Sequence, residues 1–69
     1  MPKIHTATPY RVFKGETRGT WEIWARDTIT GETGSRYAVC DQEAHADWMV
    51  KALNRDWRAS LPAGDIVNA

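Results

Sequence analysis

Two strand-like segments flank a glycine-containing turn in the middle of this chain, and this arrangement constrains the fold more than any other feature. Thr20–Arg26 and Ser35–Cys40 are rich in aromatic and β-branched residues, which favour strands. The segment between them, Asp27–Gly34, is polar, and its glycines can take the positive φ angles that tight turns need. The pattern predicts an antiparallel β-hairpin.

A third strand and one helix complete the predicted domain. Tyr10–Phe13 has strand character and is joined to the hairpin by a polar turn with two glycines, Lys14–Gly19. After the hairpin, Asp41 is placed to cap a helix, because its carboxylate can accept from the free amides of the first turn. The helix is predicted to run from about residue 42 to residue 57 or 59, where proline and glycine follow.

These elements predict an α+β fold in which a three-stranded antiparallel β-meander packs on one C-terminal α-helix. The domain spans residues 10–59. Residues 1–9 are expected to form a flexible N-terminal arm. Residues 60–69 are expected to form a tail that packs on the helix or on a second subunit.

Length, cysteine content and charge limit the kind of protein this is. Sixty-nine residues allow one domain with one small core. The single cysteine, Cys40, excludes an internal disulfide and a cysteine-rich zinc site, and it fits a reducing compartment. No apolar run approaches the roughly 20 residues that span a bilayer, so a soluble protein of the cytoplasm, or of a host cell's cytoplasm if phage-encoded, is expected. The net charge of +0 argues against strong non-specific nucleic-acid binding.

The predicted helix has a charged side and a wide apolar side. The charged side, which is interpreted as a solvated face, carries Glu43, Asp47, Lys51, Asn54 and Arg58. The apolar side carries His45, Ala46, Met49, Ala52, Leu53 and Trp57, flanked by Trp48 and Val50. This arc is wider than the stripe that one sheet covers. The C-terminal tail is one candidate cover, and a second copy of the chain, contacting Trp48, Met49, Val50 and Trp57, is the other.

Alternation along the strands divides the predicted sheet into two faces. The apolar face, expected to meet the helix, takes Tyr10, Val12, Trp21, Ile23, Ala25, Tyr37 and Val39. The opposite face, expected to be open, takes Arg11, Phe13, Glu22, Trp24, Arg26, Arg36 and Ala38. Trp21 is therefore expected in the core and Trp24 on the surface. An error of one residue in strand register would exchange the two faces.

The open face is the candidate functional surface. Tryptophan and arginine dominate the energetics of protein interfaces, and the same side chains suit nucleic acid through phosphate contacts and stacking. The residues expected to contact a partner are Trp24, Phe13, Arg26, Arg36 and Arg11. The alternative is that Trp24 only lies flat against the arginine stems.

Catalytic and metal chemistry have little support in the sequence. Cys40, Asp41 and His45 are close together and allow two interpretations, a metal site or a Cys–His nucleophile pair at a helix N-terminus. The first lacks a fourth ligand, since His5 is in the expected arm, and the second lacks an orienting residue and an oxyanion donor. The segment 31–34 is too short for a phosphate loop and precedes no helix. We expect no enzyme, no cofactor and no metal.

Three short motifs spread over the hairpin and the helix resemble a known family. They are GTW at residues 19–21, DxxTG at residues 27–31 and AxxxW at residues 44–48, followed by Leu53. They resemble the arm-binding domains of tyrosine-type phage integrases, which belong with the AP2-like DNA-binding modules. The resemblance implies a sheet in the DNA major groove, with Trp24, Arg26, Arg36 and Arg11 facing DNA. The chain departs from the family in its neutral charge and in Glu22 at the centre of that face.

Two functions follow as hypotheses. The chain is similar in size and architecture to stand-alone accessory proteins of bacteriophages and mobile elements, which implies a non-catalytic binding protein that occludes or modulates a host protein machine. The alternative is a sequence-specific DNA-binding module of the integrase-arm type. Salt dependence separates them, because DNA binding weakens steeply with salt in proportion to the phosphates contacted.

Overall fold

The fold is α+β, as the sequence predicts: a three-stranded antiparallel sheet packs against one helix, and a small parallel strand pair is added. The computed structural model describes residues 1–68. The elements in chain order are β1 (Ile4–His5), β2 (Tyr10–Lys14), β3 (Trp21–Arg26), β4 (Thr33–Cys40), α1 (Glu43–Ala59) and β5 (Ile66–Val67).

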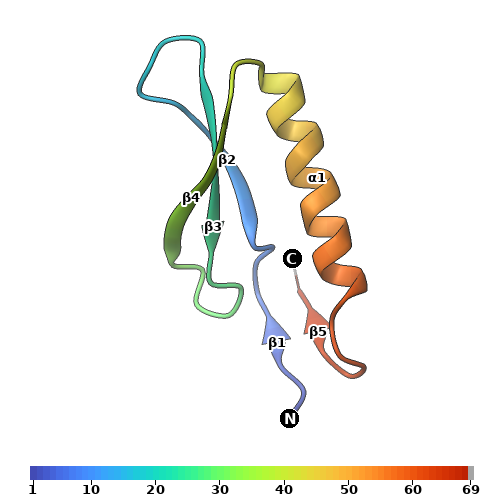
Figure 1. The fold of residues 1–69 in the computed structure, drawn as a ribbon. Helices are drawn as coiled ribbons and strands as arrows, with labels where there is room; N and C mark the ends of the chain where they lie inside the picture. The colour runs from blue at the N-terminus through green and yellow to red at the C-terminus, as the bar shows by residue number, and fades with distance from the viewer. Residues whose placement is uncertain (69) are drawn as a thin grey trace.

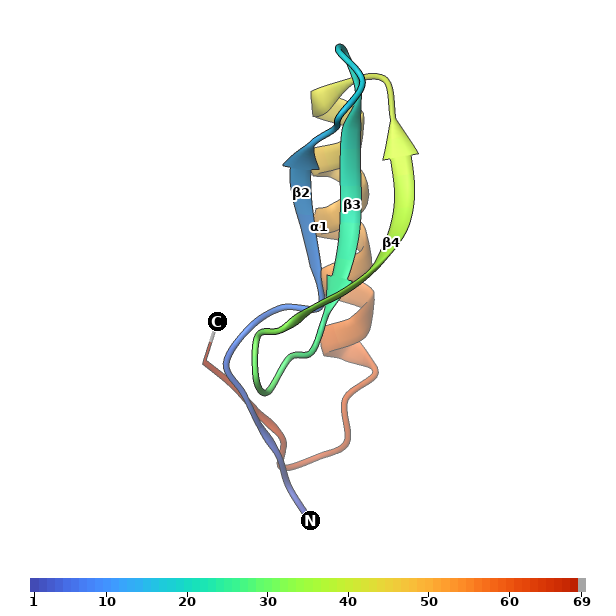
Figure 2. The same cartoon turned by 90° about the vertical axis from the view of Figure 1, so that its left-hand side faces the viewer.

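The elements form an elongated molecule, 43 × 20 × 15 Å along its principal axes. The strand order of the main sheet is β2-β3-β4, and α1 packs across one face of all three strands, which leaves the other face open (Figures 1 and 2). The parallel pair β1–β5 lies beyond the lower end of this sheet, next to the end of α1 (Figure 1).

The core is small and lies between β3 and α1. Ile23, at the middle of the central strand, and Ala46 on the helix are both 0% exposed, and Cys40 is buried beside them. Because alanine is small, it lets the helix backbone approach the sheet closely at this point. The partly buried side chains packed around these three are Tyr10, Val12, Trp21, Ala38, Met49 and Val50. The expectation that Trp21 belongs to the core is confirmed.

β4, the third strand of the main sheet, does not follow simple alternation, because its pairing with β3 is irregular. Ile23 pairs with Ala38, but the next residue, Trp24, pairs with Arg36, so Tyr37 is an extra residue in β4. A bulge of this kind shifts the alternation of the strand by one position. Ala38 therefore faces the helix, and Val39 pairs with Glu22 and is 51% exposed. The predictions that Val39 is in the core and that Ala38 is on the open face are wrong.

Two predictions about the helix are also corrected. The cap residue is Gln42, in an extended conformation, and not Asp41. Asn54, expected on the solvated side, instead bonds to the backbone of Tyr10: its Nδ2 donates to the Tyr10 carbonyl (3.2 Å) and its Oδ1 accepts from the Tyr10 amide (3.1 Å). This side chain therefore supplies hydrogen-bond partners to both backbone polar groups of Tyr10, at the outer edge of β2.

The first nine residues are not a loose arm in this structure. Ile4 and His5 form β1, which pairs in parallel with β5 in the C-terminal tail, and His5 and Pro9 are buried. The tail reaches β1 through a turn at Gly64, whose φ of 96° is one that non-glycine residues rarely adopt. The N-terminal and C-terminal segments are therefore joined through the pairing of β1 with β5.

Candidate functional site

The open face of the sheet consists of two rows of side chains across the three strands. The register aligns Phe13, Glu22 and Val39 in one row, and Arg11, Trp24 and Arg36 in the next. We call these six residues the open face. Four of the five residues predicted to contact a partner lie on it, and Val39 joins them because of the bulge in β4.

Glu22 organises the centre of the open face. Its side chain is only 13% exposed, although it lies on the side of the sheet away from the helix. Its carboxylate accepts a hydrogen bond from the indole Nε1 of Trp24 (2.8 Å) and lies 3.6 Å from the guanidinium of Arg36. Glu22 thus orients Trp24 by accepting its indole hydrogen bond, and it is also the ionic partner of Arg36.

The periphery of the open face is cationic and accessible. The guanidinium carbon of Arg11 lies 4.9 Å from the ring centroid of Phe13, a cation–π distance. Phe13 is 36% exposed, and the side chain of Arg36 is 55% exposed. With two arginines and one glutamate, the open face has a net charge of +1. Apolar surface at Phe13, Trp24 and Val39 is therefore framed by two cations.

Arg26, the fifth predicted contact residue, is bonded to the N-terminal segment. Its Nε donates to the carbonyl of Thr8, and its Nη2 donates to the Thr8 hydroxyl (3.2 Å). Partial burial, and secondarily the charge of Arg11, lower the pKa of Arg26 from its usual value, and it remains a cation at neutral pH. Arg26 ties the N-terminal segment to the sheet, and it lies close enough to Arg11 of the open face for the two positive charges to interact.

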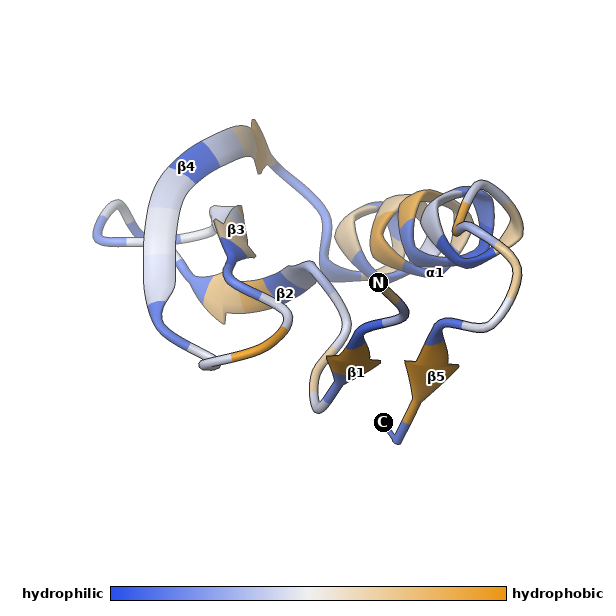
Figure 3. Cartoon of the chain, turned by 90° about the horizontal axis from the view of Figure 1, so that it is seen from below, coloured by the Kyte–Doolittle hydropathy of each residue, from blue (hydrophilic) through white to orange (hydrophobic). Residues whose placement is uncertain are grey.

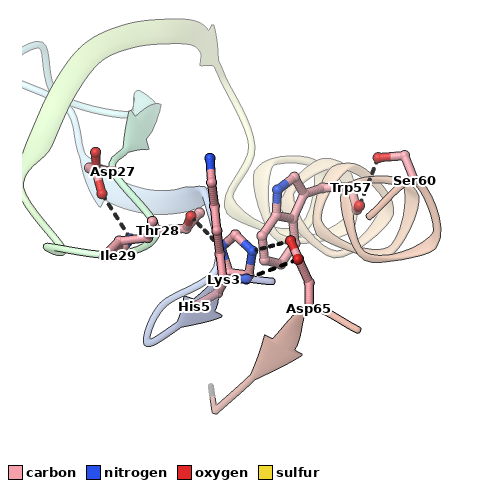
Figure 4. A network of polar contacts seen from close by, with 8 residues as sticks. All are labelled: Lys3, His5, Asp27, Thr28, Ile29, Trp57, Ser60 and Asp65. Atoms are coloured by element: carbon pink, nitrogen blue, oxygen red, sulfur yellow. Dashed lines mark hydrogen bonds and ion pairs between the residues drawn. The ribbon is translucent and has the colours of Figure 1, made fainter. Parts of the chain in front are cut away.

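A second cluster, which sequence reasoning missed, surrounds His5 (Figure 4). The Nε2 atom of His5 lies 3.0 Å from a carboxylate oxygen of Asp65, and its Nδ1 lies 2.8 Å from the hydroxyl of Thr28. The other oxygen of Asp65 accepts from the backbone amide of Lys3 (3.0 Å), and the ring of Trp57 meets the imidazole edge-on, 5.1 Å between centroids. Four separate segments of the chain meet at this histidine.

The order carboxylate, imidazole, hydroxyl is also found in nucleophilic relays. Here His5 and Asp65 have side-chain exposures of 7% and 5%, so the imidazole is shut off from solvent. The hydrogen bond from His5, followed by that from the Lys3 amide, lowers the pKa of Asp65 below its usual value, despite a smaller opposing effect of burial. The cluster holds a stable ionised carboxylate and joins the chain termini, which is a structural task.

Cys40, Asp41 and His45 do not form a site. The Cys40 thiol is buried and lies 3.7 Å from the Met49 sulfur, whereas Asp41 and His45 are exposed. The ring of His45 lies 6.2 Å from that of Trp48. Within residues 1–68, no group of three or more histidine, cysteine, aspartate or glutamate side chains is placed to hold a metal ion.

The wide apolar side of the helix is largely used inside the molecule. Met49 and Val50 pack on the core, and Trp57 is half-buried against His5. Trp48, in contrast, is 67% exposed. The part of the chain that the structure describes holds no helix both long and apolar enough to cross a bilayer.

Comparison with known proteins yields no relative: no family model, no curated protein and no solved structure matches this chain. The class that the fold defines is a small α+β domain with one sheet face covered by a helix and the other open.

Proposed function

We propose that this is a non-catalytic binding protein whose open face engages a protein partner. One observation carries the proposal: Trp24 stands on an uncovered sheet face, held by its hydrogen bond to Glu22 and set between Arg11 and Arg36. An aromatic side chain fixed before binding loses little conformational freedom in a complex. Tryptophan and arginine are also the residues that most often dominate interface energetics.

The chemistry of the open face describes the partner. An apolar group of the partner packs on Phe13, Trp24 and Val39, and its carboxylates meet Arg11 and Arg36. The resemblance to accessory proteins of phages and mobile elements makes a protein machine of the host cell the expected partner, which the domain occludes or modulates.

DNA is the second candidate, favoured by the two accessible arginines of the open face. The net charge of +1 on this face limits the number of phosphates it can neutralise, and so limits the affinity that phosphate contacts can supply for DNA. The carboxylate of Glu22, whose side chain is 13% exposed, also occupies the centre of the face that DNA bases would meet. These two features favour a protein partner.

The experiment is affinity capture from a host lysate with wild type, Trp24→Ala and Trp48→Ala, with and without nuclease treatment. Trp48 is the matched control, because it is an exposed tryptophan on the helix and not on the open face. A protein retained by wild type and Trp48→Ala, lost with Trp24→Ala and indifferent to nuclease, supports the proposal. Partners lost after nuclease treatment point to DNA, and partners lost with Trp48→Ala alone contradict the assignment of the surface.

A further inference from the structure

The terminal strand pair has an inverted polarity. Ile4 and Ile66 are direct partners in the β1–β5 register, so their side chains lie next to each other on one side of the pair. They are 55% and 51% exposed, whereas the neighbouring His5 is 5% exposed. A monomer in water gains free energy by burying isoleucine, whereas burial of the His5 ring costs little because both of its nitrogens have hydrogen-bond partners. The strand pair therefore leaves apolar surface in water that contact with a partner would bury.

A third exposed isoleucine lies near the terminal strand pair. Ile29, 47% exposed, lies on the loop after β3, and its carbonyl accepts a hydrogen bond from the hydroxyl of Thr6, next to β1 (2.9 Å). Seen from below, β1 and β5 stand out as hydrophobic strands at the surface (Figure 3). We call the surface made by Ile4, Ile66 and Ile29 the terminal face.

The total exposed surface is large for a folded monomer of this mass, which leaves area that a partner would cover. The chain exposes 5014 Å², about 600 Å² more than the roughly 4,400 Å² expected for a folded monomer of its mass. Its radius of gyration is 13.0 Å, against about 11 Å for a typical domain of this length. A standard protein interface removes about 800 Å² from each partner, which is close to the excess.

Charge indicates which surface two copies share. Two open faces brought together would oppose their net positive charges. At the terminal face the nearby charges, Lys3 and Asp65, cancel, and Asp65 is already bonded to His5 and to the Lys3 amide. A two-fold axis also needs one self-complementary patch, which paired isoleucines supply.

We propose that the terminal face is the interface of a symmetric homodimer, in which Ile4 and Ile66 of one copy pack on the same residues of a second copy. The dimer leaves both open faces accessible, since the terminal strands lie beyond the end of the main sheet (Figure 1). The inference is independent of the proposed function.

The test is sedimentation equilibrium of the full chain over a wide concentration range, for wild type, Ile66→Lys and Val39→Lys. Val39 and Ile66 are both 51% exposed, so the second variant adds the same charge to an equally exposed apolar position on the open face. We expect a dimer for wild type and Val39→Lys. For Ile66→Lys we expect a dimer dissociation constant at least tenfold higher than that of wild type. A wild type that stays monomeric at the highest concentration overturns the proposal, as does a Val39→Lys variant that dissociates as readily as Ile66→Lys.

A second measurement uses only the wild type and so does not depend on how a variant folds. Amide chemical shifts recorded during dilution are expected to change in residues 3–6, 28–30 and 65–68. Changes confined to β2, β3 and β4 would assign self-association to the open face and overturn the proposal. Val39→Lys also separates the two hypotheses, because it is expected to weaken partner capture while leaving the dimer intact.

Discussion

The indole nitrogen of Trp24 donates a hydrogen bond to the carboxylate of Glu22, two residues earlier on the same strand and on the same face of the sheet, at 2.8 Å. This pair decides how the open face presents its tryptophan. Without an acceptor, the ring would be free to change rotamer, and Arg36 would lose its ionic partner.

Glu22→Ala is expected to weaken partner binding about as much as Trp24→Ala, although Glu22 itself is nearly covered. The loss of this acceptor is expected to lower the free energy of unfolding by about 0.5–1.5 kcal/mol, because both donors can bond to water instead. Urea denaturation and partner titration measure the two effects. Glu22→Gln is the control, because its amide oxygen still accepts from the indole, and binding that falls equally with both variants would argue against the orienting role.

The two tryptophans of β3 are expected to respond differently to removal. Trp21→Ala empties space beside Ile23 and Cys40 and is expected to cost about 3 kcal/mol, whereas Trp24→Ala is expected to cost about 1 kcal/mol. Thermal melts of both variants test this difference. Equal losses of stability, or a larger loss for Trp24→Ala, would contradict the assignment of Trp21 to the core and Trp24 to the surface.

The main sheet and the helix could be predicted because their signals are local. Strand-like segments, glycine turns and one apolar helix side define β2, β3, β4 and α1 without knowledge of contacts. The opposite orientations of Trp21 and Trp24 also follow from their separation within one strand.

The features that sequence reasoning missed depend on contacts between distant residues. His5 and Asp65 are 60 positions apart, and Asn54 meets Tyr10 across 44. A bulge leaves no signature in the pattern of β4, since Val39 looks like a core residue under strict alternation. The error did not change the faces of Trp24 and Glu22, because both are in β3 and the extra residue is in β4.

Ile23 is expected to be the most sensitive aliphatic position of the chain. It is 0% exposed at the centre of a core that includes only a few other buried side chains among residues 1–68. Ile23→Ala is expected to cost about 2–5 kcal/mol, and Ile23→Val about 1 kcal/mol. In a domain of this size the first loss is a large share of the total stability. Denaturant unfolding of the two variants measures it, and a midpoint for Ile23→Ala equal to that of wild type would contradict the position of the core.

The His5–Asp65 pair is expected to make stability fall at acidic pH. Because the folded-state pKa of Asp65 is depressed below the value of 3.8, its contribution is fully present above that value and is lost as pH falls through the lower folded-state pKa. Asp65→Asn keeps an oxygen that accepts from His5 but removes the ionisable group. The variant is therefore expected to be less stable than wild type at neutral pH and to lose less stability on acidification.

Melting temperatures of both proteins from neutral pH down to about pH 2 measure the difference, across the range where carboxylates titrate. Asp27, whose pKa is lowered by the backbone amides of Thr30 and Ile29, contributes a residual acid dependence to both proteins. Parallel acid limbs for wild type and Asp65→Asn would exclude the pair as a source of the pH dependence.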